Sequence, residues 1–385
     1  MANGRVRTIL YVTGTRADYG LMNQTLDVIE STPTLALEIV ASGMHVMPEF
    51  GMTVEEVKAD HPNVHVVNAD YSTDGRESAA LFVGAFVKRL THTIKETNAD
   101  VVLLLGDRAE MLAGAVAATY LGVPIAHVHG GDVSSTVDEH VRHAITKLAH
   151  IHFPATQKSA ERIIKMGEEA WRIHCVGSPA IDAIRNERFI DPNEIARLYD
   201  LDLSKPIILV VQHPISGEVD DASLQMRATL DAIVQLKHQT IVIFPNAAAG
   251  GRAMIRVLEK YRSLAFLRAF ETMSRSHYLS LMNVAGVLVG NSSSGIIESP
   301  LFHLPAVNIG TRQQGRECAS NIINVDYDTS QIIAATKTAL EDAMFRGIVD
   351  QCKNPYGDGT ASVRIAGVLR EVEIDARLLQ KHMTY

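Results

Sequence analysis

Short runs of aliphatic and β-branched residues recur along the chain, and most of them end at glycine or at a group of polar side chains. Runs that are apolar without alternation are typical of parallel strands buried on both faces. They predict strands at residues 7–12, 35–41, 64–68, 101–105, 123–128, 151–153 and 173–176, and then at residues 207–211, 241–244, 286–289 and 306–309.

Longer amphipathic or alanine-rich segments separate these runs. They predict helices at residues 18–30, 76–97, 111–120, 137–149, 222–237, 253–262, 331–346 and 360–380. The helix at 137–149 has a capping-box signature, with Thr136 as the N-cap and Glu139 three residues later. Strand–helix alternation of this kind predicts an α/β fold with doubly wound parallel sheets.

The pattern is interrupted once, between residues 186 and 205, where the chain is more charged and contains Pro192 and Pro206 nearby. At 385 residues the chain is too long for one ordinary core, so we place a linker there. The predicted division is an N-terminal domain at 1–188, a C-terminal domain at 189–365, and a last helical segment at 366–385 that packs back toward the N-terminal domain. Two Rossmann-like domains of this kind are expected to face a cleft at the carboxyl ends of their strands.

Composition narrows the function. The net charge is −8 and aromatic residues are 5% of the chain, which excludes the basic, ring-bearing surface of a nucleic-acid-binding protein. The three cysteines are scattered, so neither a disulfide framework nor a thiolate zinc site is expected. The N-terminus enters a strand directly and no apolar run is long enough for a bilayer, so we expect a cytoplasmic protein with no membrane partner.

The stretch from Gly286 to Pro300 carries the clearest candidate binding element. The apolar residues up to Val289 are followed by a small polar turn and then by helical sequence from about Ser294. A helix N-terminus after a strand binds anions through free backbone N–H groups. Ser292 and Ser293 add hydroxyl donors, and Glu298 is placed one turn later to accept hydrogen bonds from a ribose diol. The alternative is that the serines only cap a helix, and this stretch alone does not separate the two.

Polar residues also follow most of the other predicted strands. In the first domain these are Thr15, Arg16, Asp18, His45, Asp107, Arg108, His129 and Asp132, and in the second they are His213, Asn246, Thr311 and Arg312. So many at one edge of each sheet favour a site over ordinary polar loops. Arginine and serine suit phosphate, whereas carboxylates and histidines suit proton transfer. Asp138 and Arg142 share a helix face, either as a surface ion pair or as a cleft carboxylate held by arginine.

Three other motifs are weaker. His127 and His129 share a strand face near Asp132, but no further histidine has metal-site spacing, so we expect no metal and a buried core role for His127. The sequence from Gly290 to Ser294 nearly matches a hydrolase nucleophile elbow, yet its fifth residue is not glycine and no suitable acid and histidine follow. The turn after the first strand is neither a dinucleotide-binding fingerprint nor a P-loop, so we expect neither NAD nor ATP chemistry.

Taken in order, these motifs resemble those of the hydrolysing UDP-N-acetylglucosamine 2-epimerases, which open sialic acid synthesis. The resemblance spans nearly the whole chain and rests on Val12-Thr-Gly-Thr-Arg-Ala-Asp-Tyr-Gly20, Gly43-Met-His45, Leu105-Gly-Asp-Arg108, His127-Val-His-Gly-Gly-Asp132, Arg142-His-Ala-Ile-Thr-Lys-Leu-Ala-His150, Gln212-His-Pro214, Gly290-Asn-Ser-Ser-Ser-Gly295, Gly310-Thr-Arg312 and Tyr356-Gly-Asp-Gly359. It implies the glycosyltransferase type B architecture, a UDP-sugar substrate, no cofactor, and a homo-oligomer, either a dimer or a tetramer.

The resemblance also implies roles for individual residues. The diphosphate would be held by Arg16, His213, Ser292, Ser293 and Arg312, with Glu298 on the ribose and Asp18 and Asn246 elsewhere in the substrate site. Proton transfer would fall to Asp107 and to Asp132 or Asp138, with His45, Arg108 and His213 nearby. Some members of the family have glutamate where this chain has His129, and others have histidine there followed by an acid three residues later, so Asp132 and Asp138 both stay candidates for the second acid or base.

The expected reaction needs two proton-transfer groups on opposite faces of the sugar. One removes the C2 proton as UDP leaves, and after water adds to the resulting 2-acetamidoglucal the other returns a proton. Three alternatives stay open: the same reaction on UDP-2,4-diacetamido-2,4,6-trideoxyglucose for legionaminic acid synthesis, a UDP-sugar glycosyltransferase, and a non-catalytic nucleotide-sugar sensor.

Overall fold

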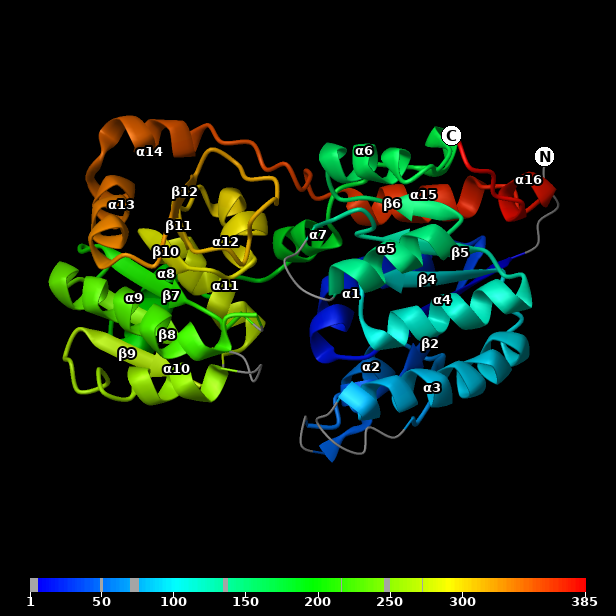
Figure 1. Ribbon diagram of the computed structural model, residues 1–385, viewed down its shortest axis with the longest axis horizontal. Coiled ribbons are helices and arrows are strands. Elements are labelled where there is room, and N and C mark those ends of the chain that lie inside the picture. Colours follow the sequence, from blue (N-terminus) through cyan, green and yellow to red (C-terminus); the bar gives the residue numbers. More distant parts are fainter. Residues whose placement is uncertain are drawn as a thin grey trace. The chain divides into compact units, whose positions relative to one another are not determined.

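A computed structural model describes residues 6–48, 51–69, 76–133, 138–215, 217–245, 250–271 and 273–385. The described residues form two compact units (Figure 1). The first consists of the residues up to Arg185 together with those from Tyr356 to the end, and the second is Asn186–Pro355. The sequence had indicated these divisions near residues 188 and 365. The return lies at Tyr356 because its carbonyl accepts a 2.7 Å hydrogen bond from the Ser178 N–H of the first unit.

The first unit contains a six-stranded parallel sheet in the order β3-β2-β1-β4-β5-β6. Its strands are β1 (Arg7–Thr13), β2 (Leu35–Ala41), β3 (Val64–Val66), β4 (Val101–Leu105), β5 (Ile125–Val128) and β6 (Ile151–Phe153). The predicted strand at residues 173–176 is wrong, since only Ile173 forms a bridge, with His152. The neighbouring strand ends at Phe153, and Pro154 has no N–H with which to extend the ladder.

Helices cover both faces of this sheet. They are α1 (Arg16–Ser31), α2 (Val54–Asp60), α3 (Arg76–Glu96), α4 (Ala109–Leu121), α5 (Asp138–Leu148), α6 (Gln157–Lys165), α7 (Pro179–Arg185), α15 (Ala361–Glu371) and α16 (Ala376–Leu379). On one face Leu26 of α1 and Ile365 of α15 pack against the strands, and on the other Phe86 of α3 and Met111 of α4 do so. The predicted N-cap Thr136 lies outside the described residues.

The second unit contains another six-stranded parallel sheet, in the order β12-β11-β10-β7-β8-β9. Its strands are β7 (Ile207–Val211), β8 (Gln239–Ile243), β9 (Leu267–Phe270), β10 (Val287–Gly290), β11 (Ala306–Ile309) and β12 (Ile322–Val325). The sequence did not predict β9 or β12. Both lie at edges of the sheet, where a strand pairs on one side only, and both are partly exposed and therefore lack a continuous apolar run.

The helices of the second unit are α8 (Pro192–Tyr199), α9 (Ala222–Leu236), α10 (Gly251–Leu258), α11 (Arg275–Val284), α12 (Ser294–Ile297), α13 (Thr329–Glu341) and α14 (Ala343–Asp350). The predicted linker is therefore wrong in part, because it contains α8. Asp191 caps this helix through the Asn193 N–H at 2.9 Å, and Pro192 occupies its first turn. Tyr199 then packs edge-on against Phe270, which fixes α8 to the second unit.

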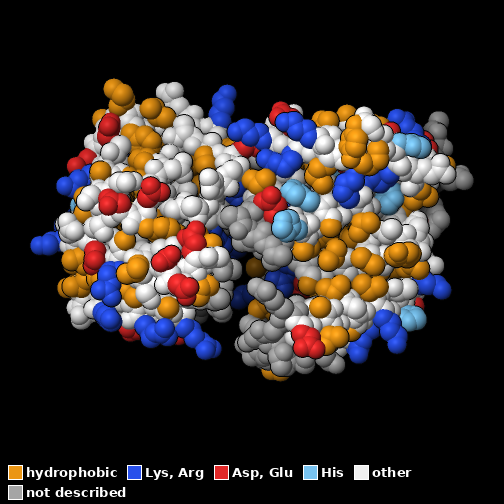
Figure 2. Space-filling view, in the orientation of Figure 1, with side chains coloured by type: hydrophobic (Ala, Val, Ile, Leu, Met, Phe, Trp, Pro, Cys, Tyr) orange, Lys and Arg blue, Asp and Glu red, His pale blue; other side chains and the backbone are white. Residues whose placement is uncertain are grey.

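Both units are doubly wound parallel α/β sheets, which confirms the predicted fold class. On the face shown in Figure 2, acidic and basic side chains of the described residues are interspersed, without a basic stripe. Within the described part of the chain, no helix has the length and apolar character needed to cross a membrane.

Candidate active site

Asp107 lies just beyond β4, where Gly106 turns the chain with a φ of +74°. Its Oδ2 accepts a hydrogen bond from Nη2 of Arg142, a nearly buried residue of α5. Nη1 of the same guanidinium donates to the Asp132 carbonyl at 3.0 Å. The sequence had paired Arg142 with Asp138, whose side chain lies outside the described part. The positive guanidinium of Arg142 thus lies against the Asp107 carboxylate, which is partly exposed beyond the strand end.

Neighbouring histidines have different environments. His127 is fully buried, with Nε2 donating to the Gly106 carbonyl at 2.8 Å and Nδ1 3.2 Å from the Thr146 hydroxyl. Burial lowers its pKa to about 3, so the ring is neutral, and its predicted core role is confirmed. His129 and Asp132 contact each other, with 3.1 Å between Nδ1 and Oδ2. In the described residues no group of three histidine, cysteine, aspartate or glutamate side chains is arranged to hold a metal ion.

Asp18 lies in the first turn of α1, after β1, and His45 lies in the short 3-10 helix Gly43–Val46 after β2; both are buried. The Asp18 carboxylate accepts from the N–H groups of Gly14 and Thr15 at 3.1 and 3.2 Å and from the Thr13 hydroxyl, and forms a capping box with Thr15. Burial raises its pKa to about 6. His45 lies between the hydroxyls of Thr13 and Thr53, at 3.0 and 2.8 Å, and burial lowers its pKa to about 4.

Arg108 is held by Glu110, which was not among the candidate residues predicted from the sequence. Its Nε and Nη2 donate to the two carboxylate oxygens of Glu110, each at 3.2 Å, and Nε lies 3.8 Å from Asp18. Glu110 is fully buried in a cradle that only glycine permits: a Cβ on Gly14 would lie 2.4 Å from its carboxylate, and one on Gly43 2.2 Å. Arg16 by contrast is exposed and pairs with Glu56 at 3.0 Å.

In the second unit, Asn291 holds together the ends of three strands. Its side chain accepts from the His213 N–H at 2.7 Å and donates to the His213 carbonyl at 2.9 Å. Its own carbonyl accepts from Arg312 at 3.0 Å and from Gln313 at 2.8 Å. Gly290 precedes it because a Cβ there would lie 2.1 Å from the Val211 carbonyl. Asn291, also missed at first, thus fixes the loops that carry His213 and Arg312.

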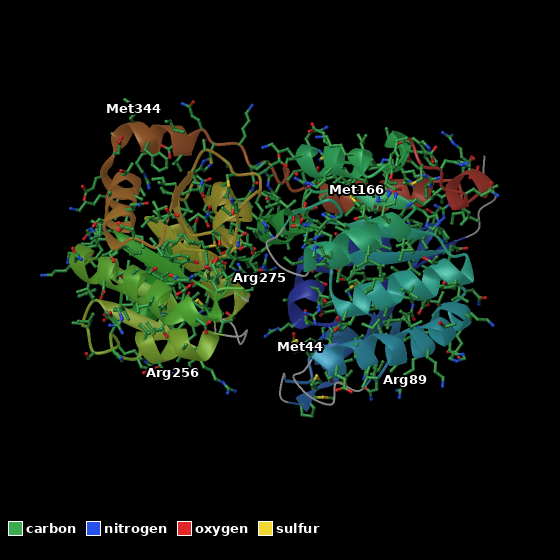
Figure 3. All side chains as sticks on the ribbon, viewed as in Figure 1. Met44, Arg89, Met166, Arg256, Arg275 and Met344 are labelled. Carbon is green, nitrogen blue, oxygen red and sulfur yellow. The ribbon has the colours of Figure 1, made fainter. Side chains whose placement is uncertain are left out.

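The serine turn has the predicted strand–turn–helix form. α12 begins at Ser294, and the Ser292 hydroxyl lies 2.9 Å from that of Ser294, which in turn bonds to Tyr278. Glu298 follows α12 and is buried, 3.5 Å from Arg275 at the start of α11 (Figure 3). Burial raises the pKa of Glu298, and the nearby Arg275 opposes that change.

Arg312 places a positive charge beside His213. His213 has its pKa lowered to about 4 by burial and by Arg312, so the imidazole is neutral. Burial also lowers the pKa of Arg312, although an arginine stays protonated near neutral pH. Thr311, the neighbour of Arg312, donates to Glu218 at 2.8 Å. Asn246 lies outside the described residues.

A family model described as UDP-N-acetylglucosamine 2-epimerase matches residues 27–370. This chain belongs to the UDP-N-acetylglucosamine 2-epimerase family. The resemblance found in its motifs is thereby confirmed, and the chain is a UDP-sugar 2-epimerase.

Among relatives of this epimerase is the UDP-N,N'-diacetylbacillosamine 2-epimerase (hydrolyzing) of Legionella pneumophila, 37% identical over 99% of this chain and 100% of the relative. The UDP-N-acetylglucosamine 2-epimerase of Neisseria meningitidis serogroup B is 33% identical over 96% of each chain.

Solved structures agree in fold with this epimerase. The UDP-GlcNAc 2-epimerase of Neisseria meningitidis bound to UDP-GlcNAc has a TM-score of 0.80 at 16% identity, covering 94% of this chain and 99% of that one. That of Methanocaldococcus jannaschii in complex with UDP-GlcNAc and UDP has a TM-score of 0.77 at 18% identity, with coverage of 94% and 99%. At this identity the likeness concerns the fold, which is of the glycosyltransferase type B kind.

Proposed function

We propose that this epimerase is of the hydrolysing type and converts UDP-N-acetylglucosamine and water into N-acetylmannosamine and UDP. The observation that carries the proposal is Asp107, a carboxylate that pairs with the Arg142 guanidinium at the carboxyl end of the central strand β4. Family membership supplies the UDP-sugar and the change at C2. A protein that only bound UDP, without catalysis, would not need this carboxylate.

The reaction has two stages. A base takes the C2 proton while the bond from C1 to the diphosphate oxygen breaks, which gives 2-acetamidoglucal and UDP. Water then adds at C1, and an acid returns a proton to C2 from the opposite face. We assign one of these proton transfers to Asp107 and the other to Asp132 or Asp138, since general acids and bases must act from both sides of the ring.

We assign UDP to the second unit. Arg312 and the neutral His213 would bind the diphosphate together with the hydroxyls of Ser292 and Ser293, because positive charge and fixed donors stabilise the departing anion. Glu298 would accept hydrogen bonds from the ribose hydroxyls. Arg16, whose partner Glu56 is exposed, can exchange that ion pair for a phosphate contact.

A second substrate has support of its own. The Legionella relative, at 37% identity over its full length, is named for UDP-N,N'-diacetylbacillosamine. The alternative is therefore UDP-2,4-diacetamido-2,4,6-trideoxyglucose, with the same chemistry at C1 and C2.

One experiment in heavy water tests both the type of reaction and the identity of the sugar. The protein is incubated with each nucleotide sugar, and the released sugar is identified by NMR. The proposal expects deuterium at C2 and the manno configuration, and the substrate that turns over faster identifies the sugar. Asp107→Asn should cut turnover on the order of 100-fold or more. A gluco-configured product with protium at C2 would overturn the proposal, because a transferase or hydrolase acting at C1 leaves C2 untouched.

A further inference from the structure

A chain of hydrogen bonds runs through the loop after β5. Nε2 of His129 lies 2.9 Å from the Ser178 hydroxyl, and its Nδ1 lies 3.1 Å from Oδ2 of Asp132. Oδ1 of Asp132 accepts a hydrogen bond of 2.6 Å from the Ser159 hydroxyl. Serine, histidine and aspartate in this order are the arrangement that activates a serine nucleophile in hydrolases.

Ser178 does not have the exposure that a nucleophile needs. Its side chain is completely buried, and its backbone N–H donates to the Tyr356 carbonyl at 2.7 Å. A hydroxyl that no substrate can approach serves instead as a fixed partner for the imidazole. The arrangement therefore holds His129 in place from both ends of its ring.

The Asp132 carboxylate is also held in place by neighbouring side chains. Ser159 and His129 engage both of its carboxylate oxygens, and its side chain is only 12% exposed. A general acid or base must direct an oxygen to the proton that it transfers. Asp107 differs, because the bond from Arg142 engages its Oδ2 and its side chain is 21% exposed.

The backbone connects these residues to Asp107. The Asp132 carbonyl accepts a hydrogen bond of 3.0 Å from Nη1 of Arg142, and Nη2 of the same arginine donates to the Asp107 carboxylate. We infer that His129 and Asp132 are positioning residues, which hold Arg142 and through it Asp107, and that Asp132 transfers no proton. This inference rests on the proposed function, in which Asp107 transfers one of the two protons.

The backbone of His129 supports a positioning role. Its φ is +61°, in the left-handed region that residues with a side chain seldom adopt. Such a conformation persists where surrounding contacts fix it. Here the His129 N–H donates to the Phe153 carbonyl at 3.0 Å while both ring nitrogens are bonded.

The inference predicts an unusual tolerance. Because a carboxylate only accepts, Nδ1 of His129 must carry the proton facing Asp132, and in the neutral ring Nε2 accepts from Ser178. In Asp132→Asn the amide can donate to Nδ1 if the ring proton moves to Nε2, and its oxygen can still accept from Ser159. The hydrogen-bond chain is kept with one tautomer exchanged for the other, so we expect turnover to fall less than about tenfold. Loss of a proton-transfer group would cost about 100-fold or more.

The test compares Asp132→Asn, Ser178→Ala and His129→Gln with Asp107→Asn as the reference for a lost proton-transfer group. We expect kcat to fall less in Asp132→Asn than in the reference, KM to stay unchanged, and the losses in Asp132→Asn and Ser178→Ala to combine less than multiplicatively. A 100-fold loss in Asp132→Asn with an intact fold would overturn the inference.

Ring nitrogen NMR on the protein labelled with nitrogen-15 histidine gives an independent readout, with the His129 signal assigned by its loss in His129→Gln. We expect a proton on Nδ1 in the parent protein and on Nε2 in Asp132→Asn. An unchanged tautomer would overturn the inference. This measurement needs no substrate, so it still decides the hydrogen-bond chain if no nucleotide sugar is turned over, a result that would count against the proposed function alone.

Discussion

Glu298 shows burial and charge in competition at one carboxylate. It is buried near Arg275, and burial is the larger influence on its pKa. If it accepts the ribose hydroxyls, Glu298→Gln should weaken UDP binding by roughly 1–3 kcal/mol, the scale of a hydrogen bond to a charged group. Ser292→Ala should weaken it less, because backbone donors remain. Calorimetric titration with UDP measures both, and unchanged affinity in the two variants would contradict the assigned site.

Glu110 allows a matched comparison with Glu56, since each pairs with an arginine and only Glu110 is buried. Glu110→Gln leaves Arg108 without its charged partner inside the protein, so we expect the free energy of unfolding to fall by about 1–3 kcal/mol. Glu56→Gln should change it by about 0–1 kcal/mol, as for exposed pairs. Denaturant unfolding gives both values. Equal effects would mean that burial does not strengthen the Arg108 pair.

Asp18, Asp107 and Glu110 show which side-chain roles can be predicted from the sequence and which cannot. Asp18 and Asp107 were predicted as site residues because they follow strands. Asp18 also satisfies the capping-box spacing with Thr15, a signal that was readable and that explains its observed bonds. Glu110 gave no such signal, since it lies in the first turn of an apolar helix. Only the close approach of Gly14 and Gly43, which belong to other elements, reveals it.

At the scale of elements, buried strands were predicted from their apolar runs, and helix ends were not. The predicted helices at 331–346 and 360–380 are each divided in two. Asp342 caps α14 through the N–H groups of Met344 and Phe345, and Asp375 caps α16 through Leu378. An aspartate inside an amphipathic pattern is ambiguous, because whether it caps a new helix or faces solvent depends on how the next segment packs.

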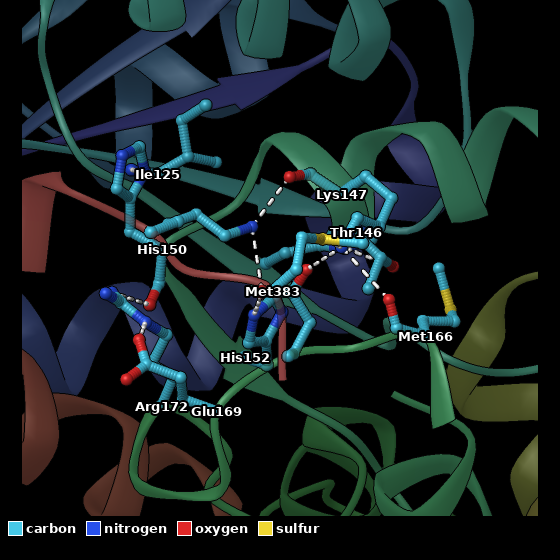
Figure 4. A network of polar contacts seen from close by, with 12 residues as sticks. Ile125, Thr146, Lys147, His150, His152, Met166, Glu169, Arg172 and Met383 are labelled. Atoms are coloured by element: carbon cyan, nitrogen blue, oxygen red, sulfur yellow. Dashed lines mark hydrogen bonds and ion pairs between the residues drawn. The ribbon is translucent and has the colours of Figure 1, made fainter. Parts of the chain in front are cut away.

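The segment after α15 is fixed by buried charges (Figure 4). Arg172 is almost fully buried and donates to the carbonyls of Leu378 at 2.7 Å and Arg377 at 2.8 Å. Lys381 donates to Glu168 at 2.8 Å. Although burial opposes it, hydrogen bonds from His152, Lys147 and Lys381 lower the pKa of Glu168 to about 2. This carboxylate therefore stays ionised and stabilises the fold above its unfolded pKa of about 4.5.

Arg172→Met should therefore be strongly destabilising. It leaves the carbonyls at the end of α16 without donors in a buried place, for which we expect a loss of about 2–4 kcal/mol and a decrease in Tm of about 5 °C or more. Arg370→Met is the matched control, since Arg370 is exposed and pairs with the adjacent Glu371. It should leave Tm nearly unchanged. If the two variants melt together, Arg172 does not hold the C-terminal segment.

At the scale of the whole molecule, buried histidines determine the response to acid. Burial lowers the pKa of His45, His150 and His213 to about 4. In the unfolded chain these histidines bind protons at about pH 6.5. The stability that their neutral rings contribute is therefore fully present above that pH and is lost as the pH falls toward 4. Asp18 acts in the opposite direction, because burial raises its pKa to about 6 and the folded state gains stability when it is protonated.

With His127, whose pKa burial also lowers, four histidines oppose the two buried carboxylates Asp18 and Glu298, so Tm should decrease from pH 7 to pH 5. Asp18→Asn removes one opposing group and should make the decrease steeper. Calorimetric scans of both proteins at several pH values check this. A Tm that rises on acidification would show that these imidazoles are not neutral in the folded protein.

The way the chain is divided predicts which part folds alone. The second unit is continuous from Asn186 to Pro355 and has its own sheet and core. The first unit needs the returning segment, because Ile365 and Leu369 of α15 fill one face of its sheet and Asp182 binds the N–H groups of Ala361 and Ser362 at 3.1 and 2.7 Å. A fragment ending at Arg185 should therefore stay unfolded, whereas residues 186–355 should fold.

The folded fragment then tests where UDP binds. Ser292, Ser293, Glu298, His213 and Arg312 all belong to it, and among the proposed diphosphate residues only Arg16 is missing. We expect UDP to bind the fragment within about tenfold of the intact protein, a difference of about 1.4 kcal/mol for one lost contact at an exposed arginine. Glu298→Gln in the fragment should weaken UDP as it does in the full chain. If the fragment is folded by circular dichroism and calorimetry finds no UDP binding, the nucleotide does not depend mainly on this unit, and its assignment to the serine turn is wrong.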